Sequence, residues 1–214
     1  MKLIDELFKN LGVLLLLINA ILYSYTYYKT KKNTALAYFA TYLILTFCIL
    51  SLSIIIVEYF GVKNNLFLSH FYFLFQFIFL SLFYKCLFTK KQKNWVNIIF
   101  GLVALVLSIQ YFNNSSLFTK FNLLEILLTS LPLVLYSIIH LYNSLGRTRK
   151  YMYINSAVLI YLSVSALIFI LANLIITIDD ALSINVWFLN KVFYVGYLIL
   201  ILIEWKTSLW KTKN

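Results

Sequence analysis

The stretch ALAYFATYLILTFCILSLSIIIV, residues 35–57, decides the fold class, because it runs through 23 residues without one charged side chain. A helix that crosses a bilayer needs about 20 consecutive apolar residues, so this stretch is long enough to span one. Six further stretches of the same kind occupy residues 11–28, 66–88, 95–112, 122–143, 153–178 and 186–205. We therefore predict an all-α fold, a polytopic bundle of seven transmembrane helices that residues 1–214 form as a single domain.

The composition of the whole chain supports a membrane location. Of its 214 residues, 63% are hydrophobic and only 12% are charged, and the mean hydropathy is +0.89. A soluble domain carries about 25% charged residues and has too little interior to hide this much apolar surface. One proline and five glycines exclude an outer-membrane barrel, whose alternating strands need frequent turns.

The distribution of the basic residues predicts the orientation of the bundle. Lys and Arg in short loops stay in the cytoplasm, because positive segments resist translocation. Twelve of the eighteen basic residues follow the first, third, fifth or seventh span: Lys29, Lys31, Lys32, Lys90, Lys91, Lys93, Arg147, Arg149, Lys150, Lys206, Lys211 and Lys213. The N-terminus is therefore expected outside and the C-terminus inside. Anionic lipid headgroups, rather than nucleic acid, are the expected partners of the net charge of +11.

Several polar residues are predicted to lie about one helical turn below the outer surface, and they form our candidate ligand-binding pocket: His70, Glu125, Asn173, Asn190 and Lys191. Ionisable side chains inside a bilayer are costly, so each of them needs an explanation. Turned toward a common interior, these side chains would form an outward-facing pocket in which Glu125 and Lys191 pair. The alternative is that each side chain reaches separately to the headgroups.

Near the midplane the sequence offers few polar groups. Asn19 of the first span and Gln76 of the third are the long amide side chains there, and we expect them to form a polar pair between helices. Pro132 lies at the centre of the fifth span. Its missing N–H and its clash with the carbonyl of Leu128 predict a helix kink, which is either a hinge or a static packing feature.

No motif in the sequence assigns an enzymatic activity, since HExxH, GxSxG and phosphate-binding loops are absent from it. We therefore expect no catalytic residue, no metal and no cofactor. His70 and His140 are predicted on opposite sides of the membrane, so they are not expected to share a metal ion. Cys48 and Cys86 are predicted at different depths, so a disulfide between them is not expected. Lys191 lies too close to the outer end of its span to be the Schiff-base lysine of a retinal protein.

Two short segments resemble uncharacterised seven-helix inner-membrane proteins of the Bacteroidota. The first is HFYFLFQ (residues 70–76), followed by LSLFY (residues 80–84), and the second is NSAVLIYLS (residues 155–163). In that group an acidic residue stands where this chain has Gln76, so the resemblance carries no proton-linked role to this position. It implies a bacterial inner-membrane protein and supplies no activity.

Four functional hypotheses remain open. We favour a non-enzymatic sensing, signalling or accessory module that works with a cytoplasmic signalling partner, because the outer polar layer and the basic inner loops suit that role. The second is a small-solute transporter with a plan of three, one and three helices. The third is a membrane-disrupting effector of a defence locus. The fourth, an enzyme acting on lipid, rests only on His70 and Glu125.

Overall fold

The computed structural model describes residues 2–30, 33–61, 65–145, 150–175 and 180–210, and in this part of the chain every regular element is helical. Its elements are α1 (Lys2–Thr30), α2 (Thr34–Glu58), α3 (Phe67–Leu87), α4 (Lys90–Asn113), η1 (Ser115–Thr119), α5 (Leu123–Ser144), α6 (Met152–Ile175), α7 (Asp180–Glu204) and η2 (Trp205–Leu209). Seven of them are long and apolar enough to cross a membrane, which confirms the prediction of a seven-helix bundle.

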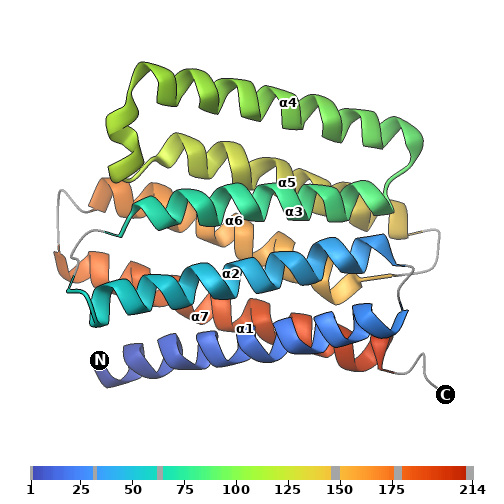
Figure 1. The fold of residues 1–214 in the computed structure, drawn as a ribbon, viewed down its shortest axis with the longest axis horizontal. Coiled ribbons are helices and arrows are strands. Elements are labelled where there is room, and N and C mark those ends of the chain that lie inside the picture. The colour runs from blue at the N-terminus through green and yellow to red at the C-terminus, as the bar shows by residue number, and fades with distance from the viewer. Residues whose placement is uncertain (1, 31–32, 62–64, 146–149, 176–179, 211–214) are drawn as a thin grey trace.

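The helices alternate in direction, so their ends collect at two opposite sides of the bundle (Figure 1). We call the side that holds the start of α1, the α2–α3 connection and η1 the N-side. The other side, which holds the end of α7, is the C-side.

Six of the helices form a closed ring in the order α1, α2, α3, α5, α6, α7 and back to α1, and each packs against the two that flank it in that order. Figure 1 shows the ring as two layers of three, with α1 to α3 in front of α5 to α7. The fourth helix, α4, lies outside the ring on α3 and α5. The order of contacts in the first three helices repeats in the last three.

The first helix begins much earlier than predicted, at Lys2 rather than at residue 11. Two ion pairs connect its added turns to α2 and α7. Lys9 Nζ lies 2.8 Å from Glu58 Oε1 of α2, and Lys191 Nζ of α7 lies 2.5 Å from Asp5 Oδ1. The search for apolar runs missed these turns because they carry charged residues.

The interior on the C-side is filled by aromatic rings, which we call the aromatic plug: Tyr23, Phe39, Phe83, Tyr84 and Tyr151. The ring centroid of Phe39 lies 5.1 Å from that of Tyr23 and 5.3 Å from that of Phe83. All five side chains are buried, so the plug fills the interior of this half of the ring. Within the ring itself, space for a ligand is therefore expected toward the N-side.

Candidate functional site: an axial pocket and a buried histidine–glutamate cluster

A pocket of about 340 Å³ lies inside the six-helix ring, in its N-side half. Its walls come from α2 and α3 on one side and from α6 and α7 on the other, with Phe121 contributing from the segment before α5. Because α2 and α3 belong to one layer and α6 and α7 to the other, the pocket lies between the layers, on the axis of the ring. We call it the axial pocket.

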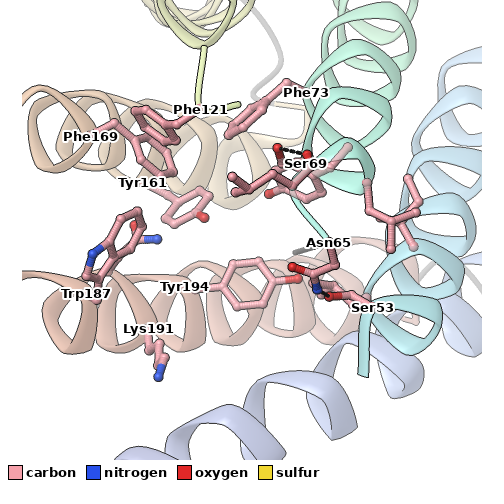
Figure 2. Close-up of a pocket in the computed structure, with 16 residues that line it drawn as sticks. Ser53, Asn65, Ser69, Phe73, Phe121, Tyr161, Phe169, Trp187, Lys191 and Tyr194 are labelled. Atoms are coloured by element: carbon pink, nitrogen blue, oxygen red, sulfur yellow. Dashed lines mark hydrogen bonds between the residues drawn. The ribbon is translucent and has the colours of Figure 1, made fainter. Parts of the chain in front are cut away.

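Seven of the sixteen residues that line the axial pocket are aromatic, and their rings form one side of its wall (Figure 2). Phe73 and Phe121 both lie against Phe169, with ring centroids 5.6 and 5.9 Å apart, and Phe169 lies 5.7 Å from Trp187. These contacts join α3, α6 and α7 through side chains alone. A wall of this kind binds apolar or planar groups and supplies little charge.

Some polar groups of the pocket are already hydrogen-bonded within the protein. Asn65 Nδ2 donates to Ser53 Oγ at 2.5 Å, and the Ser69 hydroxyl donates to the Leu66 carbonyl at 2.5 Å. At the α1–α7 edge, Lys191 Nζ lies 2.5 and 2.7 Å from the two carboxylate oxygens of Asp5. These groups shape the pocket while leaving it nearly uncharged.

Two polar atoms of α7 behave differently. Asn190 Oδ1 and the Tyr194 hydroxyl are buried, and neither has a hydrogen-bond partner among the described residues. Both residues line the axial pocket. A buried polar atom without a partner costs about 1–3 kcal/mol, so these two positions are where a ligand would gain most from hydrogen bonding.

A tyrosine–glutamine network forms the floor of the pocket. Gln76 Nε2 donates to the hydroxyls of Tyr72 at 3.2 Å and Tyr42 at 3.4 Å, and the Tyr197 hydroxyl donates to that of Tyr42 at 3.1 Å. Tyr72 also lines the pocket, and Gln76 follows it one helical turn deeper. The floor thus links α2, α3 and α7 directly above the aromatic plug.

A second polar feature lies outside the ring axis, between α3, α4 and α5. His70 Nδ1 contacts Glu125 Oε2, and the Tyr111 hydroxyl of α4 donates to the same oxygen at 2.6 Å. His70 is 2% exposed and Glu125 is 0% exposed. Phe118 of η1 stacks on the imidazole, with centroids 5.4 Å apart. We call this group the His–Glu cluster.

Asn122 connects the His–Glu cluster to the start of α5. Its Oδ1 accepts from the Glu125 backbone N–H at 3.3 Å, which caps the helix. Its Nδ2 donates to Gln110 Oε1 at 3.2 Å and to the Tyr111 hydroxyl at 3.3 Å. The cluster therefore joins the peripheral helix α4 to the ring through partly buried hydrogen bonds.

Two atoms of the cluster, His70 Nε2 and Glu125 Oε1, are buried without a hydrogen-bond partner in the described part of the chain. An imidazole, a carboxylate and a phenol at hydrogen-bond distance are able to share a proton. They are also able to act as a polar clamp between helices. The cluster is separate from the axial pocket, since Ser69 and Phe73 line the pocket whereas His70 faces α4 and α5.

The structure divides the predicted outer pocket into these two groups. His70 and Glu125 meet in the His–Glu cluster, while Asn190 and Lys191 line the axial pocket. The predicted ion pair between Glu125 and Lys191 is wrong, because Lys191 pairs with Asp5 and Glu125 contacts His70. In the ring α6 lies between α5 and α7, which keeps these helices apart. The side chain of Asn173 lies outside the described part of the structure.

The two midplane amides do not bond to each other. Asn19 Nδ2 donates to the Leu198 carbonyl at 3.0 Å, whereas Gln76 belongs to the tyrosine network. The reason is that α2 separates α1 from α3 in the ring. Pro132 lies inside α5, whose helical assignment runs without a break from Leu123 to Ser144.

The spacing of Ser69, Tyr72 and Gln76 predicts a polar face on the third span, and all three belong to the pocket or its floor. Sequence reasoning missed Tyr42, Tyr161, Tyr194 and Tyr197, because the chain holds 17 tyrosines and nothing sets these apart. Trp187 carries only the general signal of a tryptophan near a span end, which is typical of interface anchors. No family model matches the sequence, and no curated protein and no solved structure matches it. Its function must therefore be inferred from the chemistry of the site itself.

Proposed function

We propose that this protein is a non-enzymatic membrane module that binds a small ligand in the axial pocket and passes the binding signal to a cytoplasmic partner. The observation that carries the proposal is the pocket itself. It lies between two layers of helices, and the tyrosine–glutamine network separates it from the aromatic plug. A ligand there would touch α2, α3, α6 and α7 together and so favour one spacing of the layers over another.

The proposed orientation places the N-side outside the cytoplasm, in the inner membrane of a bacterium. The basic residues Lys90, Lys91 and Lys93 begin α4 on the C-side, and Lys206 follows α7 there. Short basic segments of this kind are retained in the cytoplasm, where they would also bind anionic lipid headgroups and a signalling partner.

Thiol labelling of whole cells tests this orientation. In a Cys48→Ser/Cys86→Ser background, Ser116→Cys places a thiol in η1 on the N-side, and Lys91→Cys places one on the C-side. A membrane-impermeant maleimide is expected to label the first variant in intact cells and the second only after lysis. The reverse pattern would overturn the orientation and the cytoplasmic role of the basic segments.

Ligand binding is tested by thermal unfolding of the purified protein in detergent with a library of small molecules. Ser69→Phe fills the pocket from α3, and Leu52→Phe adds the same ring on the exposed surface of α2. We expect compounds that stabilise the wild type and Leu52→Phe but not Ser69→Phe. If every stabilising compound acts equally on all three proteins, the pocket is not a binding site.

The signalling role requires a partner on the C-side. Crosslinking in native membranes followed by purification is expected to recover one protein repeatedly, and Lys90→Ala/Lys91→Ala/Lys93→Ala is expected to weaken that recovery. Repeated isolation of the chain alone would argue against a signalling module while leaving ligand binding intact.

A small-solute transporter is the second candidate, and the repeated helix order of the ring supports it. The helices α1 to α3 and α5 to α7 pack in the same order, with α4 outside, as a plan of three, one and three helices requires. Transport needs the aromatic plug to open toward the C-side. Uptake into vesicles of a compound shown to bind the axial pocket, abolished by Ser69→Phe, would favour transport over sensing.

A further inference from the structure

We infer that the ligand of the axial pocket is an uncharged amphipathic molecule whose hydroxyl or amide group bonds to Asn190 and Tyr194 while its apolar body lies against the aromatic wall. This inference rests on the proposed function, because it names the chemical class of the ligand that the pocket takes. It goes further by assigning the polar contacts to α7.

The charge of the pocket carries the first step. Among the described residues that line it, Lys191 is the only one with a formal charge, and Asp5 neutralises that charge at 2.5 and 2.7 Å. An anionic ligand would have to displace Asp5 from Lys191. A cationic ligand would meet no free carboxylate on the lining. Burying an unpaired charge is far more costly than burying a neutral polar group, so the pocket favours a ligand without charge.

The hydrogen-bonding capacity of α7 carries the second step. Asn190 Oδ1 is an acceptor and the Tyr194 hydroxyl is both a donor and an acceptor, and both are buried without a partner in the described structure. A ligand hydroxyl donates one hydrogen bond and accepts others, so a single group satisfies both atoms. A primary amide does the same. The polar groups on α2 and α3, by contrast, are bonded within the protein already.

The aromatic wall carries the third step. A connected set of aromatic rings lies in this wall, formed by Phe73, Phe121, Phe169 and Trp187. The volume of about 340 Å³ is near the lower end of the range of roughly 300–1,000 Å³ that is usual for small-molecule sites. A compact molecule with one polar end and an aromatic or branched apolar end therefore fits better than a long-chain lipid.

Heavy-atom quenching of Trp187 tests the ligand class directly. Trp95→Phe/Trp205→Phe/Trp210→Phe leaves Trp187 as the only tryptophan of the chain. Four probes that share one bromophenyl body are added to the protein in nanodiscs: 3-(4-bromophenyl)propan-1-ol, 3-(4-bromophenyl)propanoate, 3-(4-bromophenyl)propylammonium and 1-bromo-4-propylbenzene. A matched protein that keeps only Trp95, which is exposed on α4, measures quenching from the surrounding lipid.

We expect saturable quenching of Trp187 by the alcohol, at least tenfold tighter than by the acid or the amine. Asn190→Leu/Tyr194→Phe removes the two hydrogen-bonding atoms while preserving the volume of the pocket. It should weaken the alcohol about tenfold, since two net hydrogen bonds of about 0.7 kcal/mol each correspond to that factor. The probe without a polar group, 1-bromo-4-propylbenzene, should bind the wild type and the double variant equally.

The outcomes separate this inference from the proposed function. Saturable binding of all four probes without preference for the alcohol, or tighter binding of a charged probe, overturns the ligand class and leaves the pocket as a binding site. If the double variant binds the alcohol and 1-bromo-4-propylbenzene more weakly by the same factor, the role assigned to Asn190 and Tyr194 is overturned. If no probe quenches Trp187 beyond the level of the Trp95 control, binding in the axial pocket itself is contradicted.

Discussion

At the scale of single residues, the sequence predicts which ionisable side chains lie inside the bilayer more reliably than it predicts their partners. His70 and Glu125 were both expected at one depth, and the structure brings them into contact. Lys191 was expected at the same depth, but its partner is Asp5. Depth follows from the distance to a span end, which the sequence contains. Partnership depends on the order of helices around the ring, which no feature of a single apolar helix encodes.

The His–Glu cluster predicts a large energetic asymmetry between breaking and replacing the pair. Glu125→Ala leaves a buried imidazole without its carboxylate and should cost about 3–5 kcal/mol of unfolding free energy. The double change His70→Leu/Glu125→Leu removes both polar groups and should cost less than Glu125→Ala alone. Steric trapping in bicelles measures both values.

The control for this prediction is Glu58→Ala, because Glu58 also pairs with a basic side chain but in an exposed position, at 2.8 Å from Lys9. Exposed ion pairs contribute about 0–1 kcal/mol, so this change should be nearly silent. A cost for Glu125→Ala as small as that of Glu58→Ala would show that the cluster contributes little to stability.

Asp5 offers a residue-scale test of the charge of the pocket. Asp5→Asn removes the carboxylate that neutralises Lys191, and both side chains are more than a third exposed, so the loss of stability should stay below about 1 kcal/mol. The freed lysine should instead change selectivity toward anions. We expect 3-(4-bromophenyl)propanoate to bind Asp5→Asn more tightly than the wild type in the Trp187 assay. Unchanged binding of this acid would mean that Lys191 does not influence the pocket.

At the scale of helices, length and composition predicted all seven elements, whereas their ends depended on charged residues that periodicity does not capture. The early start of α1 at Lys2 is accompanied by ion pairs with α2 and α7. The start of α4 at Lys90, five residues before the predicted span, is accompanied by a hydrogen bond from the Thr89 N–H to Gln92 Oε1 at 3.0 Å. These turns are polar, and a search for apolar runs excludes them by construction.

Asn122 is the residue on which the junction of α4 and α5 most depends. Asn122→Ala removes the cap of α5 and the bonds to Gln110 and Tyr111, so we expect a loss of about 1–2 kcal/mol or more. The same measurement on Asn114→Ala, an exposed asparagine at the other end of this connection, should show a much smaller loss. Equal losses would show that the cap and the hydrogen bonds of Asn122 contribute no more to stability than an exposed asparagine does.

At the scale of the whole molecule, the sequence predicted a bundle but not a ring with one helix outside it. The hydropathy of the apolar part of α4 falls within the range of the other six helices, and in a bilayer a lipid-facing side chain is as apolar as a buried one. The peripheral position of α4 and the axial pocket therefore could not be derived from hydrophobic patterns. The pocket lies on the N-side of the ring and the aromatic plug on the C-side. The two halves of the ring are therefore expected to differ in their access to water.

Two positions on α2 distinguish the open half of the ring from the closed half. Ser53 lines the pocket, and Ala40 lies buried thirteen residues earlier, about 20 Å away along the helix axis. In a Cys48→Ser/Cys86→Ser background, we expect Ser53→Cys to react with a small water-soluble methanethiosulfonate from the N-side. Ala40→Cys should remain unreactive from both sides, because the tyrosine network and the aromatic plug exclude water. Reaction of Ala40→Cys from the C-side would show that the plug opens, and it would favour transport over sensing.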